Sequence, residues 1–180
     1  MDFEINSNSE DALRPIYQEE NIKTAIDYIN KNVGTDGFLL DHIFNLNKIL
    51  MNNLNIHNIE VGVLRKTAMY IRDSNENYKI VAHYDNQNSI DLQLAILRHN
   101  YLKNINIINR LAEYHCKFLK VHPFNDGNGR TARFLLEIEL YRLGYRCVIE
   151  KDDNYCYALG YYFLYKKTDE FEKYIRLKIG

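Results

Sequence analysis

Apolar residues recur at helical spacing along most of this 180-residue chain, and this pattern constrains the fold more than any other feature. Positions three and four apart lie on one face of an α-helix, so each such segment carries an apolar stripe that can be buried. The pattern is found in residues 21–32, 35–50, 90–104, 105–121, 128–142, 154–166 and 169–177. It predicts a mainly α-helical protein, in which Gly144 ends the helix over residues 128–142.

The strand-like part of the sequence lies between two of these helical segments. The stretches "RKTAMYIR" and "YKIVAHY" are rich in β-branched and aromatic residues, and "DSNEN" between them is typical of a turn. We therefore expect one β-hairpin, with strands near Lys66–Ile71 and Tyr78–His83.

Length and charge limit the class of protein. The chain is long enough for one domain with a real core, which we expect over residues 16–180, after a flexible N-terminal arm over residues 1–15. The formal net charge of −1 argues against broad binding to nucleic acid or to an anionic membrane. We see no apolar run of membrane-spanning length and no secretory signal, so we expect a cytoplasmic protein.

The three cysteines, Cys116, Cys147 and Cys156, form no CxxC pair and are odd in number. This favours free thiols in a reducing compartment, with structural rather than catalytic or metal-binding roles. His115 lies seven residues before His122 on one helix face, which favours a buried structural histidine over a second base. The other histidines show no metal-ligand spacing.

The segment "VHPFNDGNGRTAR", residues 121–133, carries the chemistry. Gly127 and Gly129 flank Asn128 immediately before a predicted helix. Glycine allows a sharp turn and a close approach to a ligand, and the first N–H groups of a helix have no intrahelical partners. Together with the helix dipole, these N–H groups predict an anion site that suits phosphate.

The side chains around this turn extend the prediction. Arg130 and Arg133 lie three apart, so both guanidinium groups can hold phosphate oxygens from one helix face. Asp126 is a suitable anchor for the Mg²⁺ that accompanies a polyphosphate. His122 can act as a general base, and Phe124 would plug the loop into the core. A glycine turn or a lone histidine is usually structural, but their combination favours a nucleotide site with a general base.

The motif resembles the signature of a known family. "HPFNDGNGRTAR" matches the HxFx(D/E)GNGRxxR motif of the Fic family position by position. "LAEYHCKFLKVHPF" is similar to the family's helix before the loop, and "GVLRKTAMYI" to its Gly-x-x-Arg lead into a β-hairpin called the flap. The resemblance covers roughly residues 20–178. It implies a Fic-type helical bundle with one β-hairpin flap beside the active-site loop.

The resemblance also implies an activity, which is protein adenylylation. Such an enzyme transfers AMP from Mg-ATP to a Ser, Thr or Tyr hydroxyl of a target protein. The resemblance implies that His122 is the general base and that Asp126 is the Mg²⁺ ligand. The backbone of Gly127, Asn128 and Gly129 would form an anion hole, with a further phosphate contact from Asn128. Arg130 and Arg133 would bind the β- and γ-phosphates, and Phe124 would be structural. Because both glycines are kept, nucleotidyl transfer is favoured over the phosphorylation that one family branch performs.

Substrate recognition is implied less completely. The flap residues Thr67, Ala68, Met69 and Tyr70 would pair with an extended target segment by β-augmentation, the alternative being a plain structural hairpin. Tyr155 matches the position at which the family often places an aromatic residue against the nucleotide base. The asparagine expected further along that helix is missing from "YALGYYFLYKK", which leaves ATP, UTP and GTP open.

Regulation is predicted from a motif that is missing. Many family members carry an inhibitory helix, (S/T)xxxE(G/N), whose Glu pairs with the second motif arginine. "IYQEEN" places Glu20 before Asn21 but has Ile16 at the Ser/Thr position, and "TDEFEK" has Lys173 at the last position. We therefore hypothesise that this chain has no inhibitor of its own, and that a small antitoxin-like partner or target availability controls it.

Three other readings stay open. One is a toxin of a toxin–antitoxin pair with the same chemistry, and another is a non-catalytic nucleotide-binding adaptor. The third, removal of AMP from modified proteins, is disfavoured because it uses the inhibitory Glu. The target protein and the oligomeric state, a homodimer included, are not determined by the sequence.

Overall fold

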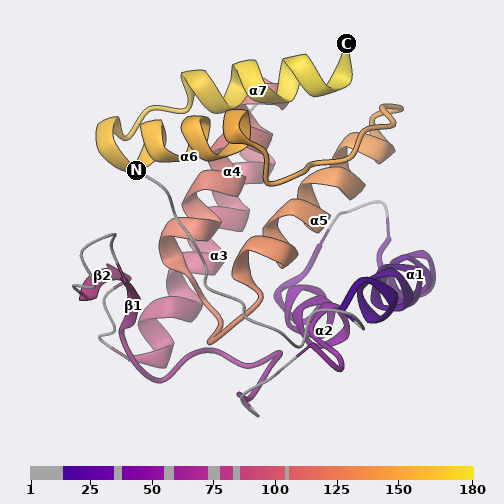
Figure 1. The fold of residues 1–180 in the computed structure, drawn as a ribbon, viewed down its shortest axis with the longest axis vertical. Coiled ribbons are helices and arrows are strands. Elements are labelled where there is room, and N and C mark those ends of the chain that lie inside the picture. The colour runs from indigo at the N-terminus through magenta and orange to yellow at the C-terminus, as the bar shows by residue number, and fades with distance from the viewer. Residues whose placement is uncertain (1–13, 35–37, 55–58, 73–77, 83–85, 104–105) are drawn as a thin grey trace. The chain divides into compact units, whose positions relative to one another are not determined.

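The computed structural model describes residues 14–34, 38–54, 59–72, 78–82, 86–103 and 106–180. The prediction of a mainly helical protein is confirmed: this part of the chain contains seven helices and two short strands (Figure 1). The helices are α1 (Arg14–Asn32), α2 (Leu40–Leu50), α3 (Gln87–Lys103), α4 (Ile107–Val121), α5 (Asn128–Arg142), α6 (Asp153–Tyr165) and α7 (Asp169–Ile179), and the strands are β1 (Met69–Arg72) and β2 (Tyr78–Ala82).

The chain divides into two compact units. Unit one comprises residues 1–87 and 122–131, and unit two comprises residues 88–121 and 132–180. The predicted motif loop therefore belongs to unit one, although the helices on either side of it continue in unit two. Most of the predicted N-terminal arm falls in residues 1–13, outside the described residues.

Unit one contains α1 packed against α2. Helix α1 begins at Arg14, seven residues before the predicted start, so "IYQEEN" lies inside this helix and not before it. Pro15 is compatible with the first turn of a helix, and the Gln and Glu residues that follow have good helix propensity, which explains the earlier start. The buried Asn21 side chain donates to the carbonyls of Leu50, at 3.3 Å, and Asn52, at 2.7 Å, and so fastens α1 to the end of α2.

The two strands of unit one pair antiparallel, with Met69 opposite Ala82 and Arg72 opposite Tyr78. Strand β1 starts three residues later than predicted, so Thr67 and Ala68 precede it. The Thr67 carbonyl accepts a hydrogen bond of 2.7 Å from the Arg65 guanidinium, which draws this residue away from the strand ladder. The turn over residues 73–77 lies outside the described residues, and the role of the strands as a flap stays a prediction.

Unit two is a helical cluster in which α4, α6 and α7 pack on one another. Helices α6 and α7 lie side by side and cross α4 near one end (Figure 1). Its core is rich in aromatic and aliphatic side chains, among them Tyr155, Phe171, Tyr174 and Ile175, none more than 2% exposed. As predicted, α5 is followed by Gly144 in a left-handed conformation (φ 92°), which glycine adopts without strain.

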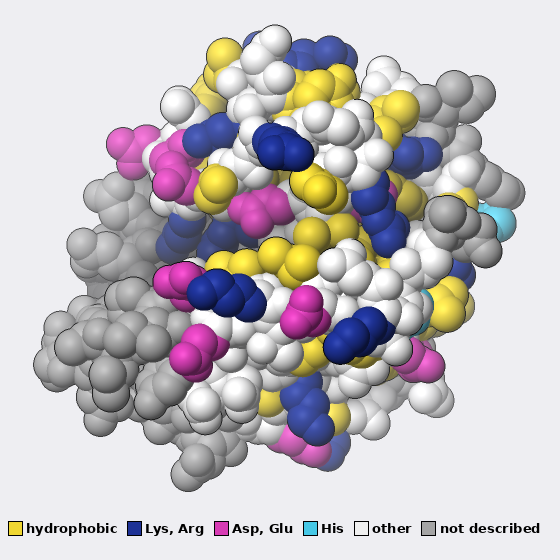
Figure 2. Space-filling view, turned by 90° about the vertical axis from the view of Figure 1, so that its right-hand side faces the viewer, with side chains coloured by type: hydrophobic (Ala, Val, Ile, Leu, Met, Phe, Trp, Pro, Cys, Tyr) yellow, Lys and Arg dark blue, Asp and Glu magenta, His cyan; other side chains and the backbone are white. Residues whose placement is uncertain are grey.

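The surface carries both signs of charge. Figure 2 shows Lys and Arg side chains interspersed with Asp and Glu on one face, in keeping with a formal net charge of −1. Among the helices that the structure describes, none has the length and apolar character needed to cross a membrane.

Candidate active site

The motif loop joins the end of α4 to the start of α5 through two residues with positive φ. His122 has φ 50° and Gly127 has φ 76°. A positive φ is uncommon for a residue with a Cβ atom, and its cost must be met by surrounding contacts. The loop therefore depends on partners that hold its backbone.

Arg65 is the first of these partners. Its side chain is 2% exposed, and its Nε donates to the carbonyl oxygen of His122 at 2.7 Å. The Arg65 backbone N–H donates to the Pro123 carbonyl at 2.9 Å. These bonds hold the backbone at the residue with unusual φ. The sequence indicates Arg65 only as part of the family-like lead "GVLRKTAMYI", in which it follows the apolar residues Val63 and Leu64.

Asn47 of α2 is the second partner and was missed. It is 0% exposed, and its Nδ2 donates to the Asp126 carbonyl at 3.0 Å and to the Thr131 hydroxyl at 3.1 Å. Its Oδ1 accepts from the Gly62 N–H at 2.8 Å. The signal was an asparagine on the buried stripe of α2, beside Leu46.

Asn128 closes the loop from inside. Its Oδ1 accepts from the Phe124 N–H at 2.9 Å, and its Nδ2 donates to the Phe124 carbonyl at 2.8 Å. Both polar atoms of this side chain are engaged with the protein, and the predicted phosphate contact of Asn128 stays a prediction. Phe124 is 0% exposed and packs edge-on against Phe44.

Gly127 cannot be replaced without strain. A Cβ atom at this position would lie 2.6 Å from Cγ and Sδ of Met51 and 2.9 Å from Nδ2 of Asn47. Its positive φ adds a conformational penalty for any other residue. The Gly127 backbone therefore approaches α2 and the turn that follows it closely.

The polar groups of the motif lie around this turn. The Asp126 side chain is exposed, and its Oδ1 accepts the Gly127 N–H at 2.6 Å, which leaves Oδ2 for a cation. The first intrahelical bond of α5 is donated by Thr131 to Gly127, at 2.8 Å, so the Asn128 and Gly129 N–H groups at the start of the helix have no intrahelical acceptor. His122 is half-buried. A carboxylate beside open helix N–H groups is a donor set that suits Mg²⁺ and phosphate.

Two cations follow on α5. Arg130 is half-buried in unit one, with its guanidinium against the sulfur of Met51. Arg133, also half-buried, belongs to unit two, where its guanidinium lies over the ring of Tyr155, 5.7 Å from the centroid.

Tyr155 does not present its ring to solvent, contrary to what a contact with a nucleotide base requires. It is 2% exposed and lies in the core of unit two, because α6 turns it toward His115 and Phe171. Burial raises its pKa to about 12, and the charge of Arg133 opposes this rise. In this position the Tyr155 ring contacts Arg133, and its predicted role in nucleotide binding stays a prediction.

His115 is held in one tautomer, as its buried contacts require. Its Nδ1 lies 3.2 Å from the Ala132 carbonyl, which can only accept, so Nδ1 carries the proton. Nε2 then accepts from the Tyr155 hydroxyl at 2.8 Å. Burial, and secondarily the charge of Arg133, lowers the pKa of His115 to about 3. His115 is therefore neutral and, as predicted, buried.

All three cysteines are free, as predicted, and Cys116 is fully buried. Burial raises the pKa of the Cys116 thiol, so it is not a nucleophile at neutral pH.

Comparison with known proteins agrees with the motif. The model of the Fic/DOC family matches residues 37–140. A protein adenylyltransferase, fic-1, of Caenorhabditis elegans is 32% identical over 114 residues, covering 63% of this chain and 21% of the relative. The protein adenylyltransferase Fic of Nematostella vectensis is 27% identical over 139 residues, covering 74% of this chain and 31% of the relative. The chain thus spans less than a third of the length of either relative.

Solved structures share the fold. A Fic-domain signalling protein from Bacteroides thetaiotaomicron superimposes with a TM-score of 0.77 at 19% identity, covering 98% of this chain and 72% of that one. BepC of Bartonella tribocorum with bound AMPPNP gives 0.60 at 15% identity, covering 93% and 86%. IbpAFic2 covalently tethered to Cdc42 gives 0.61 at 22% identity, covering 84% and 49%.

Proposed function

The chain belongs to the Fic/DOC family, and we propose that it is a protein adenylyltransferase that transfers AMP from Mg-ATP to a hydroxyl side chain of a target protein. The observation that carries the proposal is the loop from His122 to Arg130. It combines a half-buried imidazole, an exposed carboxylate and the open N-terminus of α5 on a backbone held from both sides. Relatives named protein adenylyltransferases support the same activity.

His122 would act as the general base. A neutral imidazole accepts the proton of the target hydroxyl as its oxygen attacks the α-phosphorus, and pyrophosphate leaves. The bond from Arg65 to the His122 carbonyl supports this role, because it holds the residue in one backbone conformation before the target arrives.

The phosphates would be held by α5. Its first N–H groups and Arg130 would stabilise the negative charge that develops on the phosphates, and Arg133, one turn further along the same helix, would hold the γ-phosphate. Asp126 would bind Mg²⁺ through Oδ2, the carboxylate oxygen that does not accept the Gly127 N–H. The ion would neutralise charge on the leaving pyrophosphate. An AMPPNP-bound neighbour with the same fold supports ATP as the co-substrate.

The target would add to β1. Thr67 is exposed, and Ala68 and Met69 are half-buried, so together with Tyr70 they form a segment beside which an extended peptide could pair. A neighbour of this fold is tethered to the protein Cdc42, which supports a protein as the acceptor.

The regulatory hypothesis extends the same proposal. We infer that the chain has no inhibitory helix and that a separate antitoxin-like protein, or the supply of target protein, controls its activity. We also propose that the protein acts in the cytoplasm, as a monomer or a homodimer. Glu20 is exposed on α1, and Glu20→Gly is expected to leave activity unchanged. A sharp rise in activity would contradict this.

The test is labelling with Mg-ATP that carries the label on the α-phosphate, with γ-labelled ATP alongside. We expect α-label on protein, and a loss of about 10²- to 10⁴-fold in His122→Ala, the usual contribution of a general base. His99→Ala, an exposed histidine on α3, is the matched control. Label from the γ position would mean a kinase. Nucleotide binding without any covalent product, from ATP, UTP or GTP, would favour the adaptor.

A further inference from the structure

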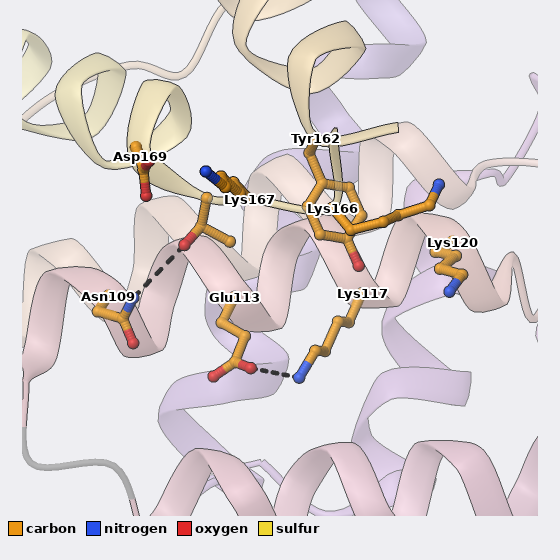
Figure 3. A pocket seen from close by; sticks show the side chains of 9 residues that line it. Asn109, Glu113, Lys117, Lys120, Tyr162, Lys166, Lys167 and Asp169 are labelled. Carbon is orange, nitrogen blue, oxygen red and sulfur yellow. Dashed lines mark hydrogen bonds and ion pairs between the residues drawn. The ribbon is translucent and has the colours of Figure 1, made fainter. Parts of the chain in front are cut away.

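A second concave site lies within unit two and contains no residue of the motif. It is a cavity of about 380 Å³ between α4, the end of α6 and the start of α7 (Figure 3). This volume falls in the range of small-molecule pockets. The residues that line it are Asn109, Glu113, Lys117, Lys120, Tyr162, Lys166, Lys167, Thr168 and Asp169.

Tyr162 offers one polar atom to this cavity. The side chain is 4% exposed and its ring belongs to the core of unit two, while its hydroxyl points toward α4 across the cavity (Figure 3). Among the residues that the structure describes, the hydroxyl has no hydrogen-bond partner, although Tyr155 and Tyr174 of the same core each have one. Burial raises the pKa of Tyr162 to about 12, so the phenol keeps its proton and can donate. A buried ring that exposes only its hydroxyl is suited to binding a polar ligand.

The cavity is positively charged. Its four lysines outnumber Glu113 and Asp169, which leaves a formal charge of +2. Lys117 forms an ion pair with Glu113, and Lys166 donates to the carbonyl of Phe163. Within the described part of the chain, the other two lysines, Lys120 and Lys167, form neither an ion pair nor a hydrogen bond. Two ammonium groups are therefore available to an anion without the loss of an existing contact.

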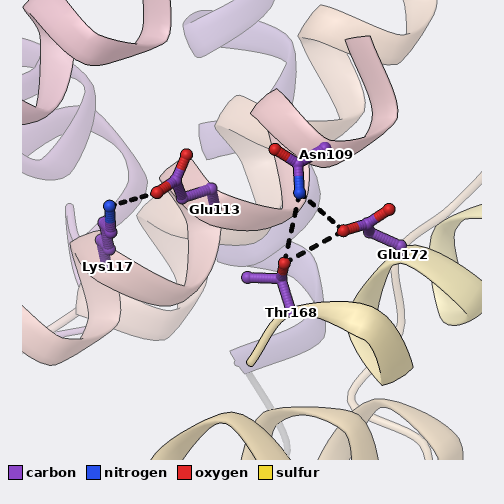
Figure 4. Close-up of polar contacts among 5 residues, drawn as sticks. All are labelled: Asn109, Glu113, Lys117, Thr168 and Glu172. Carbon is purple, nitrogen blue, oxygen red and sulfur yellow. Dashed lines mark hydrogen bonds and ion pairs between the residues drawn. The ribbon is translucent and has the colours of Figure 1, made fainter. Parts of the chain in front are cut away.

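One wall of the cavity is already ordered by side-chain bonds (Figure 4). Asn109 donates to Glu172 at 2.7 Å, and the Thr168 hydroxyl donates to the same carboxylate at 3.0 Å. These bonds engage one oxygen of the Glu172 carboxylate, and Glu172 is not among the residues that line the cavity. They also direct the Thr168 hydroxyl to Glu172. Thr168 is the N-cap residue of α7, but its side chain makes no cap hydrogen bond. The first N–H groups of α7 are thus left uncapped at the rim.

We propose that this cavity binds a phosphomonoester, with the Tyr162 hydroxyl and the ammonium groups of Lys120 and Lys167 as contacts for the phosphoryl oxygens. A phosphomonoester carries close to two negative charges at neutral pH and three acceptor oxygens, which match the charge of +2 and the available donors. The cavity is larger than a phosphate group, so the organic part of the ligand has room. The proposal stands apart from the adenylyltransferase activity, since no residue is shared.

The experiment is a titration of ¹⁵N-labelled protein with glucose 6-phosphate, and separately with inorganic phosphate, at constant ionic strength set by chloride. We expect glucose 6-phosphate to shift the amide signals of Lys120 and of residues 166–169. Tyr162→Phe and Lys120→Gln should each weaken binding about fivefold, as expected for one hydrogen bond of roughly 1 kcal/mol. Lys173→Gln, a lysine of α7 paired with Glu170 outside the cavity, should change nothing.

The same spectra decide against the proposal in three ways. Shifts confined to the amides of Gly127 to Arg130 would place the phosphate at the motif loop. Equal affinity in wild type and Tyr162→Phe would remove the hydroxyl from the site. Tighter binding of inorganic phosphate than of glucose 6-phosphate would overturn the phosphomonoester. Tyr162→Phe deletes a single oxygen, and the dispersion of its spectrum reports whether it has folded.

Discussion

The motif loop of unit one and the aromatic core of unit two are both held by buried side chains, but these side chains act in different ways. The loop is held by polar side chains, Asn47, Arg65 and Asn128, each 2% exposed or less and each bonded to backbone groups. The core of unit two is held by stacked and edge-on rings, such as His115 on Phe171 with centroids 4.6 Å apart.

The difference follows from what each region must specify. A hydrogen bond to a carbonyl fixes its direction, so three such side chains can define one loop backbone, including the unfavourable φ of His122. Packed rings fill volume and exclude water, and they tolerate small shifts more readily. Breaking a buried polar network leaves unsatisfied polar groups, so it costs much of the free energy of unfolding, whereas removing one ring contact costs less. The predictions below test this contrast.

The largest effect is expected for Arg65→Leu. The carbonyls of His122 and Thr67 would lose a charged donor inside the protein, which should cost about 4 kcal/mol of the free energy of unfolding. Urea unfolding measures this, and AMP transfer should fall with it as the loop loses its conformation. Arg142→Leu, whose partner Glu139 lies on the same helix, is the control and should cost less than 1 kcal/mol. Equal losses in the two variants would refute the role of Arg65.

Gly127→Ala comes second, at about 3 kcal/mol, since a positive φ and a contact of 2.6 Å with Met51 act together. Thermal or urea unfolding measures the loss. The added substitution Met51→Ala separates the two causes. It should relieve the contact but not the backbone strain, so the double variant should be more stable than the two separate losses predict. Strict additivity would mean that Met51 is not in the way.

The smallest effect is in unit two and depends on pH. The pKa of His115 is lowered to about 3 in the folded protein, against an ordinary value of 6.5, so the unfolded chain binds a proton that the folded one does not. The free energy of unfolding should therefore fall as the pH drops below about 6.5, by up to about 1.4 kcal/mol per pH unit for this group. Above pH 7 this contribution to stability is complete.

The measurement is a set of urea curves between pH 7.5 and pH 5 for wild type and His115→Gln. The variant has no imidazole at this position, so its stability should decline less steeply with falling pH, whatever its stability at pH 7. The exposed His99→Gln serves as the reference and should keep the wild-type slope. A His115→Gln slope equal to wild type would show that His115 is not held neutral.

Much of the fold could be predicted from local patterns. All seven helices fall on segments with apolar residues at helical spacing, and Gly144 follows α5 as expected. The start of α1 was missed, because residues 14–20 are polar and helix propensity rather than periodicity extends the helix there. Strand β1 was predicted to begin at Lys66, but the bond from Arg65 to Thr67 keeps that segment out of the ladder.

The site divides in the same way. The residues predicted to carry the chemistry, His122, Asp126 and Arg130, lie close together in the chain and could be identified from the motif alone. The environment of Tyr155 could not, because its burial against His115 depends on how α4 and α6 pack. The Tyr162 cavity was likewise invisible, since its lining comes from three helices.

The sequence by itself determined where most helices lie and which residues form the motif, because both rest on residues close together in the chain. Only the tertiary structure decided how the loop is held. Arg65 reaches His122 across 57 positions, and Asn47 reaches Thr131 across 84. A hydrogen bond between such residues leaves no periodicity in the sequence, since it requires only that folding bring one donor to one acceptor.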